Sequence, residues 1–142
     1  MEEGKKYFSC EVIFIGINNQ GNDSKQKDIY LIQAETYTVA EARVHQLIEE
    51  GKIEAGREYS IGKINPQTYI DRIGETFDDN RNYECKMLIG YEKPKVEAFI
   101  VNARSVTALL SQLPDFFREW VVDTEIDSIK KTKFVDVFNL ED

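Results

Sequence analysis

The residue types best suited to chemistry in this sequence are two cysteines, Cys10 and Cys85, and a single histidine, His45. A structural zinc site needs about four ligands, commonly in close pairs, and these residues are too few and too widely spaced. A catalytic nucleophile would need a base oriented by a third group, and no such spacing is present. We interpret the cysteines as core residues, with a redox pair as the alternative, and His45 as a solvent-facing or rim residue of a helix. We therefore expect no metal, no cofactor and no catalytic residue.

Carboxylates are abundant, because 26 Asp and Glu against 18 Lys and Arg give a formal net charge of -8. Asp71 and Asp136 occupy matched positions in the two halves of the chain. Such a pair could bind a cation or cap a neighbouring element, although we interpret both first as polar residues facing out of strands. Gly16 and Gly21 flank a polar loop that no Gly-Lys-Ser/Thr follows, so a phosphate loop is not supported. These patterns indicate that the protein is not an enzyme.

The concentrated basic stretch consists of Lys130, Lys131 and Lys133, with Phe134 beside it. Lysines next to an aromatic ring could follow the backbone of single-stranded nucleic acid and stack on a base. The acidic surroundings weaken any field that would attract phosphate. Lysines that protect an edge strand from unwanted pairing explain the same residues. Nucleic-acid binding is therefore possible but not favoured.

An aromatic cluster lies just before this basic stretch and includes Phe117 and Trp120. Aromatic clusters of this kind are usually core, but an exposed one would anchor a partner protein. The segments 116–120 and 130–134 therefore form the candidate working surface, and all the candidate contact residues lie there: Lys130, Lys131, Lys133, Phe134, Phe117 and Trp120. Self-association through sheet edges is a further expectation.

Self-similarity between the two halves predicts the elements that position these residues. Three ordered blocks match, with the second copy shorter. These blocks pair 8–13 with 83–88, 30–34 with 99–103, and 61–73 with 126–138. The pattern predicts a single α+β domain at 1–142 made of two tandem β-β-α-β repeats, 1–74 and 75–142. We expect one pseudo-two-fold domain with a mixed or antiparallel sheet and helices on one face, most simply three strands under one helix in each copy.

The expected elements follow from periodicity and capping residues. Alternation places Cys10 and Cys85 on the core faces of the first strands, and interior strands are expected near 29–35 and 98–104. Thr38 and Thr107 are the predicted helix N-caps. The third segments, about 57–73 and 123–138, are predicted to be long or broken strands. Pro66 argues for an edge, bulge or bend, and Pro114 for a kinked or split second helix.

The chain also lacks targeting signals. Its first residues do not form the apolar stretch of a signal peptide, and no apolar run reaches the roughly 20 residues of a membrane span. Two cysteines and one histidine fit a reducing compartment. We therefore expect a cytoplasmic protein without a membrane partner.

Several motifs resemble a domain-of-unknown-function family of gut bacteria and their phages and mobile elements. They are the aromatic-x-Cys opening at 8–10, the YLIQA segment leading to TVAEAR at 30–43, and the SIKKTKFVDVF segment at 128–138. Pro114 and the Asn65-Pro66 pair depart from the family pattern. The resemblance implies no known activity, and it implies a bacterial or phage-infected host. The leading expectation is a non-catalytic interaction or accessory protein that acts through a protein partner or self-association. The alternative is a single-stranded nucleic-acid-binding module that uses a sheet face and the Lys130–Lys133 strand.

Overall fold

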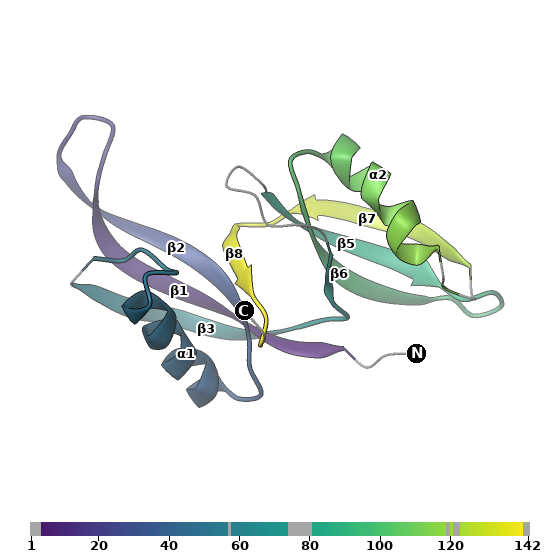
Figure 1. The fold of residues 1–142 in the computed structure, drawn as a ribbon, viewed down its shortest axis with the longest axis horizontal. Helices are drawn as coiled ribbons and strands as arrows, with labels where there is room; N and C mark the ends of the chain where they lie inside the picture. Colours follow the sequence, from purple (N-terminus) through teal and green to yellow (C-terminus); the bar gives the residue numbers. More distant parts are fainter. Residues whose placement is uncertain (1–3, 57, 74–80, 119, 121–122, 141–142) are drawn as a thin grey trace. The chain divides into compact units, whose positions relative to one another are not determined.

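A computed structural model of the chain describes residues 4–56, 58–73, 81–118, 120 and 123–140. These residues contain two helices and eight strands, and the strands form two mixed sheets. Figure 1 shows the arrangement within each unit. The chain divides into two compact units. The α1 unit contains Lys6–Gln67 with Phe134–Asp142, and the α2 unit contains Met1–Lys5 with Thr68–Lys133. The predicted α+β class with mixed sheets is therefore confirmed.

The α1 unit contains one helix and a sheet with the strand order β3-β1-β2-β8. Its strands are β1 (Lys5–Ile17), β2 (Asp23–Gln33), β3 (Tyr59–Tyr69) and β8 (Phe134–Phe138), and its helix is α1 (Tyr37–Glu49). Strand β2 is antiparallel to β1 and parallel to β8. Because β2 lies between two partners, the prediction of an interior strand near 29–35 is confirmed.

The α2 unit contains one helix and a sheet with the strand order β4-β6-β5-β7. Its elements are β4 (Arg72–Ile73), β5 (Arg81–Ile89), β6 (Lys95–Ala103), α2 (Val106–Phe117) and β7 (Thr124–Lys131). Strand β5 is antiparallel to β6 and β7, and β4 is parallel to β6. The interior position predicted for the strand near 98–104 is confirmed.

Each sheet takes its fourth strand from the other half of the sequence. Strand β8 comes from the second half of the sequence and pairs with β2, whereas β4 comes from the first half and pairs with β6. The simplest expectation of three strands per helix is therefore corrected to four. Each third segment is broken, as expected, but its two pieces belong to different sheets. Pro66 lies in β3, an edge strand of its sheet, where a missing backbone donor is tolerated.

The core of the α1 unit forms where one face of the helix covers one face of the sheet. Ala40, Val44 and Leu47 of α1 pack with Cys10 and Tyr30. These helix positions follow the spacing of about four residues that gives a helix one apolar stripe. Partly buried hydrophobic residues complete the cluster: Phe8, Phe14, Ile48, Tyr59 and Ile61. The predicted inward position of Cys10 is confirmed by its complete burial.

The core of the α2 unit is built in the same way. Leu109, Leu113 and Phe117 of α2 pack against the alternating residues of β5 and against β6. The β5 residues in this cluster are Tyr83, Cys85, Met87 and Ile89, all of which are buried. The predicted inward face of this first strand of the second half is therefore confirmed.

Both predicted helix caps were wrong by two residues. The N-cap of α1 is Thr36, whose side chain accepts a hydrogen bond from the backbone N–H of Val39 at 3.2 Å. The N-cap of α2 is Ser105, which accepts from Ala108 N at 3.2 Å. Thr38 and Thr107 instead lie within the first turn of each helix. Each helix start offers two hydroxyl residues, at 36 and 38 in α1 and at 105 and 107 in α2. The first of each pair has the extended backbone of an N-cap, so it is the one that caps the helix.

Helix α2 is not split at Pro114, although the sequence suggested a kink or a break. The element runs from Val106 to Phe117 with the proline inside it. Proline removes one hydrogen bond to the residue four positions earlier, here Leu110. Both Leu110 and Pro114 are exposed, so water can satisfy the freed carbonyl. Of the helices described, neither is long and apolar enough to cross a membrane.

Candidate interaction surface

The six residues predicted to form a contact surface are divided between the two units and differ in burial. Lys130 and Lys131 are exposed at the end of β7, and Lys133 follows as the last residue of the α2 unit. Phe134 is the first residue of the α1 unit, where it begins β8 and pairs with Ile29. The basic stretch and its neighbouring aromatic ring are therefore divided between two units.

Phe117 and Trp120 belong to the core of the α2 unit. Their ring centroids are 4.9 Å apart, and both rings contact Phe99 in edge-to-face geometry. Phe116 completes the group, with its centroid 4.9 Å from that of Phe117. Phe117 is buried and Trp120 is partly buried, so the interior interpretation of this cluster accounts for both residues.

The two cysteines are free thiols, each buried in the core of its own unit. Burial raises the pKa of Cys10 to about 12, with a further contribution from the Glu41 carboxylate. Burial likewise raises the pKa of Cys85 to about 11. At neutral pH both side chains are therefore uncharged thiols, which are poor nucleophiles and poor metal ligands.

His45 has a partner that the sequence did not reveal. Its Nδ1 lies 2.6 Å from the hydroxyl of Tyr59 at the start of β3, and the ring centroids are 5.5 Å apart. His45 is half-buried, so it lies at the rim of the core. The contact joins α1 to the edge strand of its sheet.

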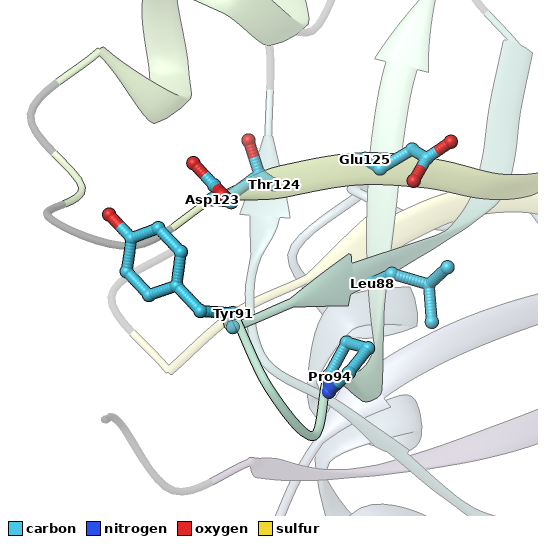
Figure 2. A pocket seen from close by; sticks show the side chains of 7 residues that line it. Leu88, Tyr91, Pro94, Asp123, Thr124 and Glu125 are labelled. Carbon is cyan, nitrogen blue, oxygen red and sulfur yellow. The ribbon is translucent and has the colours of Figure 1, made fainter.

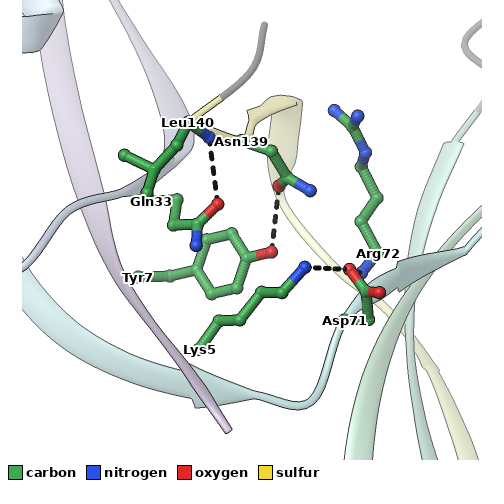
Figure 3. Close-up of polar contacts among 7 residues, drawn as sticks. All are labelled: Lys5, Tyr7, Gln33, Asp71, Arg72, Asn139 and Leu140. Carbon is green, nitrogen blue, oxygen red and sulfur yellow. Dashed lines mark hydrogen bonds and ion pairs between the residues drawn. The ribbon is translucent and has the colours of Figure 1, made fainter.

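Asp71 and Asp136 make the same local contact in the two units. Asp71 Oδ1 accepts a hydrogen bond from Arg72 N at 2.8 Å, and Asp136 Oδ1 accepts from Val137 N at 2.8 Å. Lys5 Nζ also lies 2.9 Å from Asp71 Oδ1, as Figure 3 shows. Each carboxylate thus accepts from the backbone N–H of the next residue, which begins β4 in one unit and lies within β8 in the other. Within the described ranges, no group of three or more His, Cys, Asp or Glu could hold a metal ion.

The open edge of β7 is the most distinctive surface of the α2 unit. Among the described residues, β7 pairs with β5 alone, and no described strand pairs with its other edge. Beside it, an apolar groove of about 280 Å³ separates the strand from α2. The groove is lined by Met87, Leu110, Leu113, Pro114, Phe117, Thr124 and Ile126. Leu110 and Ile126 remain 45% and 37% exposed. We call β7 and this groove the β7 edge surface.

A second cavity, of about 460 Å³, lies at the start of β7. Figure 2 shows Tyr91 and Pro94 of the β5–β6 hairpin on one side and Asp123 to Glu125 on the other. Gly90 N donates a hydrogen bond to Asp123 O at 3.0 Å, which ties the hairpin to the segment before β7. Gly90 has a φ of +120°, a conformation that favours glycine. Hollows therefore flank β7 on the side of α2 and beside the hairpin.

Comparison with known proteins assigns the chain to a family. The model described as "Domain of unknown function (DUF4494)" matches residues 6–140. The chain is a member of the DUF4494 family. The matched range includes all the strands and both helices described above, apart from the first residue of β1. No curated protein and no solved structure matches this DUF4494 chain.

Sequence reasoning missed two features of this DUF4494 domain. The His45–Tyr59 contact joins residues 14 positions apart, through a connection whose geometry the sequence does not reveal. The groove beside β7 depends on the distance between α2 and the strand. The sequence carried no separate signal for it, because residue type alone does not distinguish the exposed Leu110 from the buried Leu109 and Leu113.

Proposed function

We propose that this protein is a non-catalytic interaction protein that self-associates by antiparallel pairing of β7 with β7 of a second copy. The observation that supports this proposal is the edge position of an eight-residue strand without proline. An exposed edge offers a row of backbone donors and acceptors, and strand addition to such an edge is a common mode of recognition.

The sequence of β7 is complementary to itself in one antiparallel register. If Asp127 lies opposite Ser128 of the second copy, then Ile126 lies opposite Ile129 and Glu125 opposite Lys130. Opposite residues share a face in an antiparallel pair, and oppositely charged or apolar pairs stabilise it by about 0.2–1 kcal/mol each. By two-fold symmetry each pair occurs twice. A second copy therefore supplies an opposite charge for each charged residue of these pairs and an isoleucine for each isoleucine.

The faces of β7 agree with this register. Ile126 and Ile129 are the Cα partners of Met87 and Cys85, whose side chains face α2. Lys130 is the partner of Glu84 on the opposite face, and Glu125 is the partner of Leu88. The two isoleucines thus share one face and the two charged residues share the other. The register shift near Asp127 would lie at the centre of the dimer, with a short regular stretch on each side.

Charge reversal tests the register directly. Glu125→Lys would place two lysines opposite each other across the dimer, and Lys130→Glu would place two glutamates there. We expect each single variant to weaken the dimer about tenfold or more, because each reverses two pairs. The double variant should restore dimerisation, and an equimolar mixture of the two single variants should form a heterodimer. Sedimentation velocity over a concentration series measures both effects.

Lys25→Glu is the matched control, because it reverses an exposed strand lysine in the α1 unit. It should leave the dimer unchanged. A monomeric wild-type chain at high concentration, or single variants that dimerise as well as the wild type, would contradict the proposal. Dimers that the double variant does not restore would contradict the register.

Single-stranded nucleic acid remains the alternative for the exposed Lys130 and Lys131. Neutralising two phosphate contacts should lower the salt slope of binding by about 2. A monomeric chain that binds labelled single-stranded DNA in a salt-sensitive way, and loses that slope in Lys130→Ala with Lys131→Ala, would favour this alternative. Glu84 beside Lys130 and the net charge of -8 oppose it.

We further infer that the two halves arose by duplication within a lineage of gut bacteria and their phages or mobile elements. The equivalent strand orders of the two sheets, the caps at Thr36 and Ser105, and the matched contacts of Asp71 and Asp136 support the duplication. The resemblance described above supports the lineage, and with it an accessory role in the cytoplasm of a bacterium or an infected host.

A further inference from the structure

A cavity of about 350 Å³ lies at the carboxyl end of α1, within the α1 unit. Its lining comes from β1, β2, β8 and the segment after the helix: Phe14, Asp28, Tyr30, Gly51, Lys52, Glu54, Val135 and Asp136. The carboxyl end of a helix carries partial negative charge. Three carboxylates, those of Asp28, Glu54 and Asp136, line this cavity. They add negative charge at a helix end that already favours a cation.

Tyr30 is the first sign that this cavity receives a ligand. Its side chain is 5% exposed and its ring packs against Phe138, with centroids 6.2 Å apart. Burial raises the pKa of Tyr30 to about 12, and Asp28, Asp136 and Glu54 raise it further. Tyr30 and all three carboxylates line the same cavity. Among the described residues nothing is hydrogen-bonded to this hydroxyl. Solvent reaches its oxygen, so a group that enters the cavity can bond with it.

Asp28 is the second sign. It lies on β2 two residues before Tyr30, on the same face of the strand. Burial raises the pKa of its carboxyl group, and the described residues supply neither an ion pair nor a hydrogen bond to it. Partly buried carboxylates are costly unless a cation or a donor compensates them. Lys52 does not do so, because its Nζ pairs with Glu50 at 3.3 Å.

The remaining lining residues define the shape of the ligand. Phe14 is half-buried and Val135 is exposed, and both line the cavity with apolar atoms suited to an aliphatic stem. Glu54 adds a second carboxylate to the lining. The cavity volume is at the lower end of the range for small-molecule sites, which suits one side-chain-sized group.

We propose that this cavity binds an alkylammonium or alkylguanidinium group, with Asp28 and Glu54 holding the cation and the Tyr30 hydroxyl completing its hydrogen bonds. Two kinds of ligand carry such a group: a free amine or guanidine, and a peptide with a Lys or Arg side chain. This inference does not depend on pairing at β7, because every lining residue belongs to the α1 unit.

Titrations followed by ¹H–¹⁵N NMR of the full chain test the proposal. The probes are n-butylamine and agmatine as free amines, and acetyl-Gly-Lys-Gly-amide and acetyl-Gly-Arg-Gly-amide as peptides; 1-butanol is the uncharged control. We expect saturable shifts at the amides of Asp28, Gly51, Lys52 and Glu54 with the cations. Tighter binding of the peptides would assign a protein side chain as the ligand, and tighter binding of the free amines would assign a small molecule.

Two near-isosteric variants identify the groups responsible. Asp28→Asn should weaken binding about tenfold, because a hydrogen-bonded charge pair is lost, and Tyr30→Phe should weaken it severalfold. Asp23→Asn, on the same strand but outside the cavity, and Tyr83→Phe, in the α2 unit, should leave binding unchanged. Equal shifts with 1-butanol, no saturable shifts with any cation, or full affinity in a folded Asp28→Asn protein would overturn the proposal.

Discussion

At the scale of single residues, burial decides what the cysteines can do. Cys10 and Cys85 have the same place in their strands, and each lies in the core of its own unit. The sequence predicted this burial because both residues alternate with apolar neighbours on one face of a strand. It could not predict how strongly each thiol is perturbed, since that depends on neighbours such as Glu41 that come from another element.

The raised thiol pKa values give a testable prediction of reactivity. At pH 8 the native thiolate fractions are about a hundredfold or more below those of an unfolded cysteine, so a disulfide reagent should modify the native protein correspondingly slowly. Denaturant should release two fast-reacting thiols, as an absorbance assay with an aromatic disulfide would measure. A native rate equal to the denatured rate would contradict the burial of both side chains. Cys85→Ser isolates the contribution of Cys10.

The same pKa values set the sign of a pH effect. The unfolded thiols lose their protons near the ordinary value of 9.0, whereas the native thiols do so at about 11 to 12. Above pH 9 the unfolded state binds fewer protons than the native state, so the free energy of unfolding falls as pH rises through this window. Tyr30 and Tyr69, whose pKa values are raised to about 12, act in the same direction at still higher pH.

At the scale of elements, the helix caps separate what the sequence predicts from what only the fold determines. Thr36→Ala should lower the free energy of unfolding by about 1 kcal/mol, since the hydrogen bond to Val39 N is lost. Thr38→Ala, at the position predicted from sequence, should change it by less than about 0.5 kcal/mol. Urea denaturation of the two variants measures the difference, and a larger effect at Thr38 would restore the original assignment.

The sequence predicted both helices and the interior strands, because local periodicity determines these features. It also predicted that the third segments break, but the first break falls after Tyr69 and not at Pro66, which lies within β3. Its caps were wrong because two hydroxyls compete and the preceding strand decides the entry angle. It suggested a break at Pro114 because it did not show that this residue and Leu110 would face water. Of the contact residues, Phe117 and Trp120 were predicted to be either core or anchor, and only packing against Phe99 distinguishes the two.

At the scale of the whole molecule, β8 and the residues after it connect several elements of the α1 unit. Tyr7 Oη donates a hydrogen bond to Asn139 Oδ1 at 2.9 Å, and Leu140 N donates to Gln33 Oε1 at 3.0 Å, as Figure 3 shows. Arg43 donates to Asn139 O and to Gln33 O. These bonds fix the segment after β8 to β1, β2 and α1. No periodicity in the sequence identifies β2 as the partner of β8, because pairing is a property of the complete fold.

Ending the chain after Lys133 should therefore damage the α1 unit far more than the α2 unit. Without β8, the core loses Phe138 and one edge of β2 becomes unpaired, so amide hydrogens of β2 and α1 should exchange much faster. Protection in β5 and β6 should remain, because their sheet keeps all four strands. Hydrogen exchange with mass spectrometry measures both regions, and a chain ended after Leu140 is the control. Equal protection of β2 in the two chains would contradict this dependence.

The exchanged strands also fix an order of completion during synthesis. A ribosome makes the first three strands of the α1 unit before β5, β6 and β7, but this sheet must wait for β8, which follows β7 in the sequence. The α2 unit needs β4, which is made before the rest of its sheet, so it lacks nothing once β7 has emerged from the exit tunnel. The sheet that is begun first is therefore finished last, and the edge of β2 stays open to wrong partners until β8 has emerged.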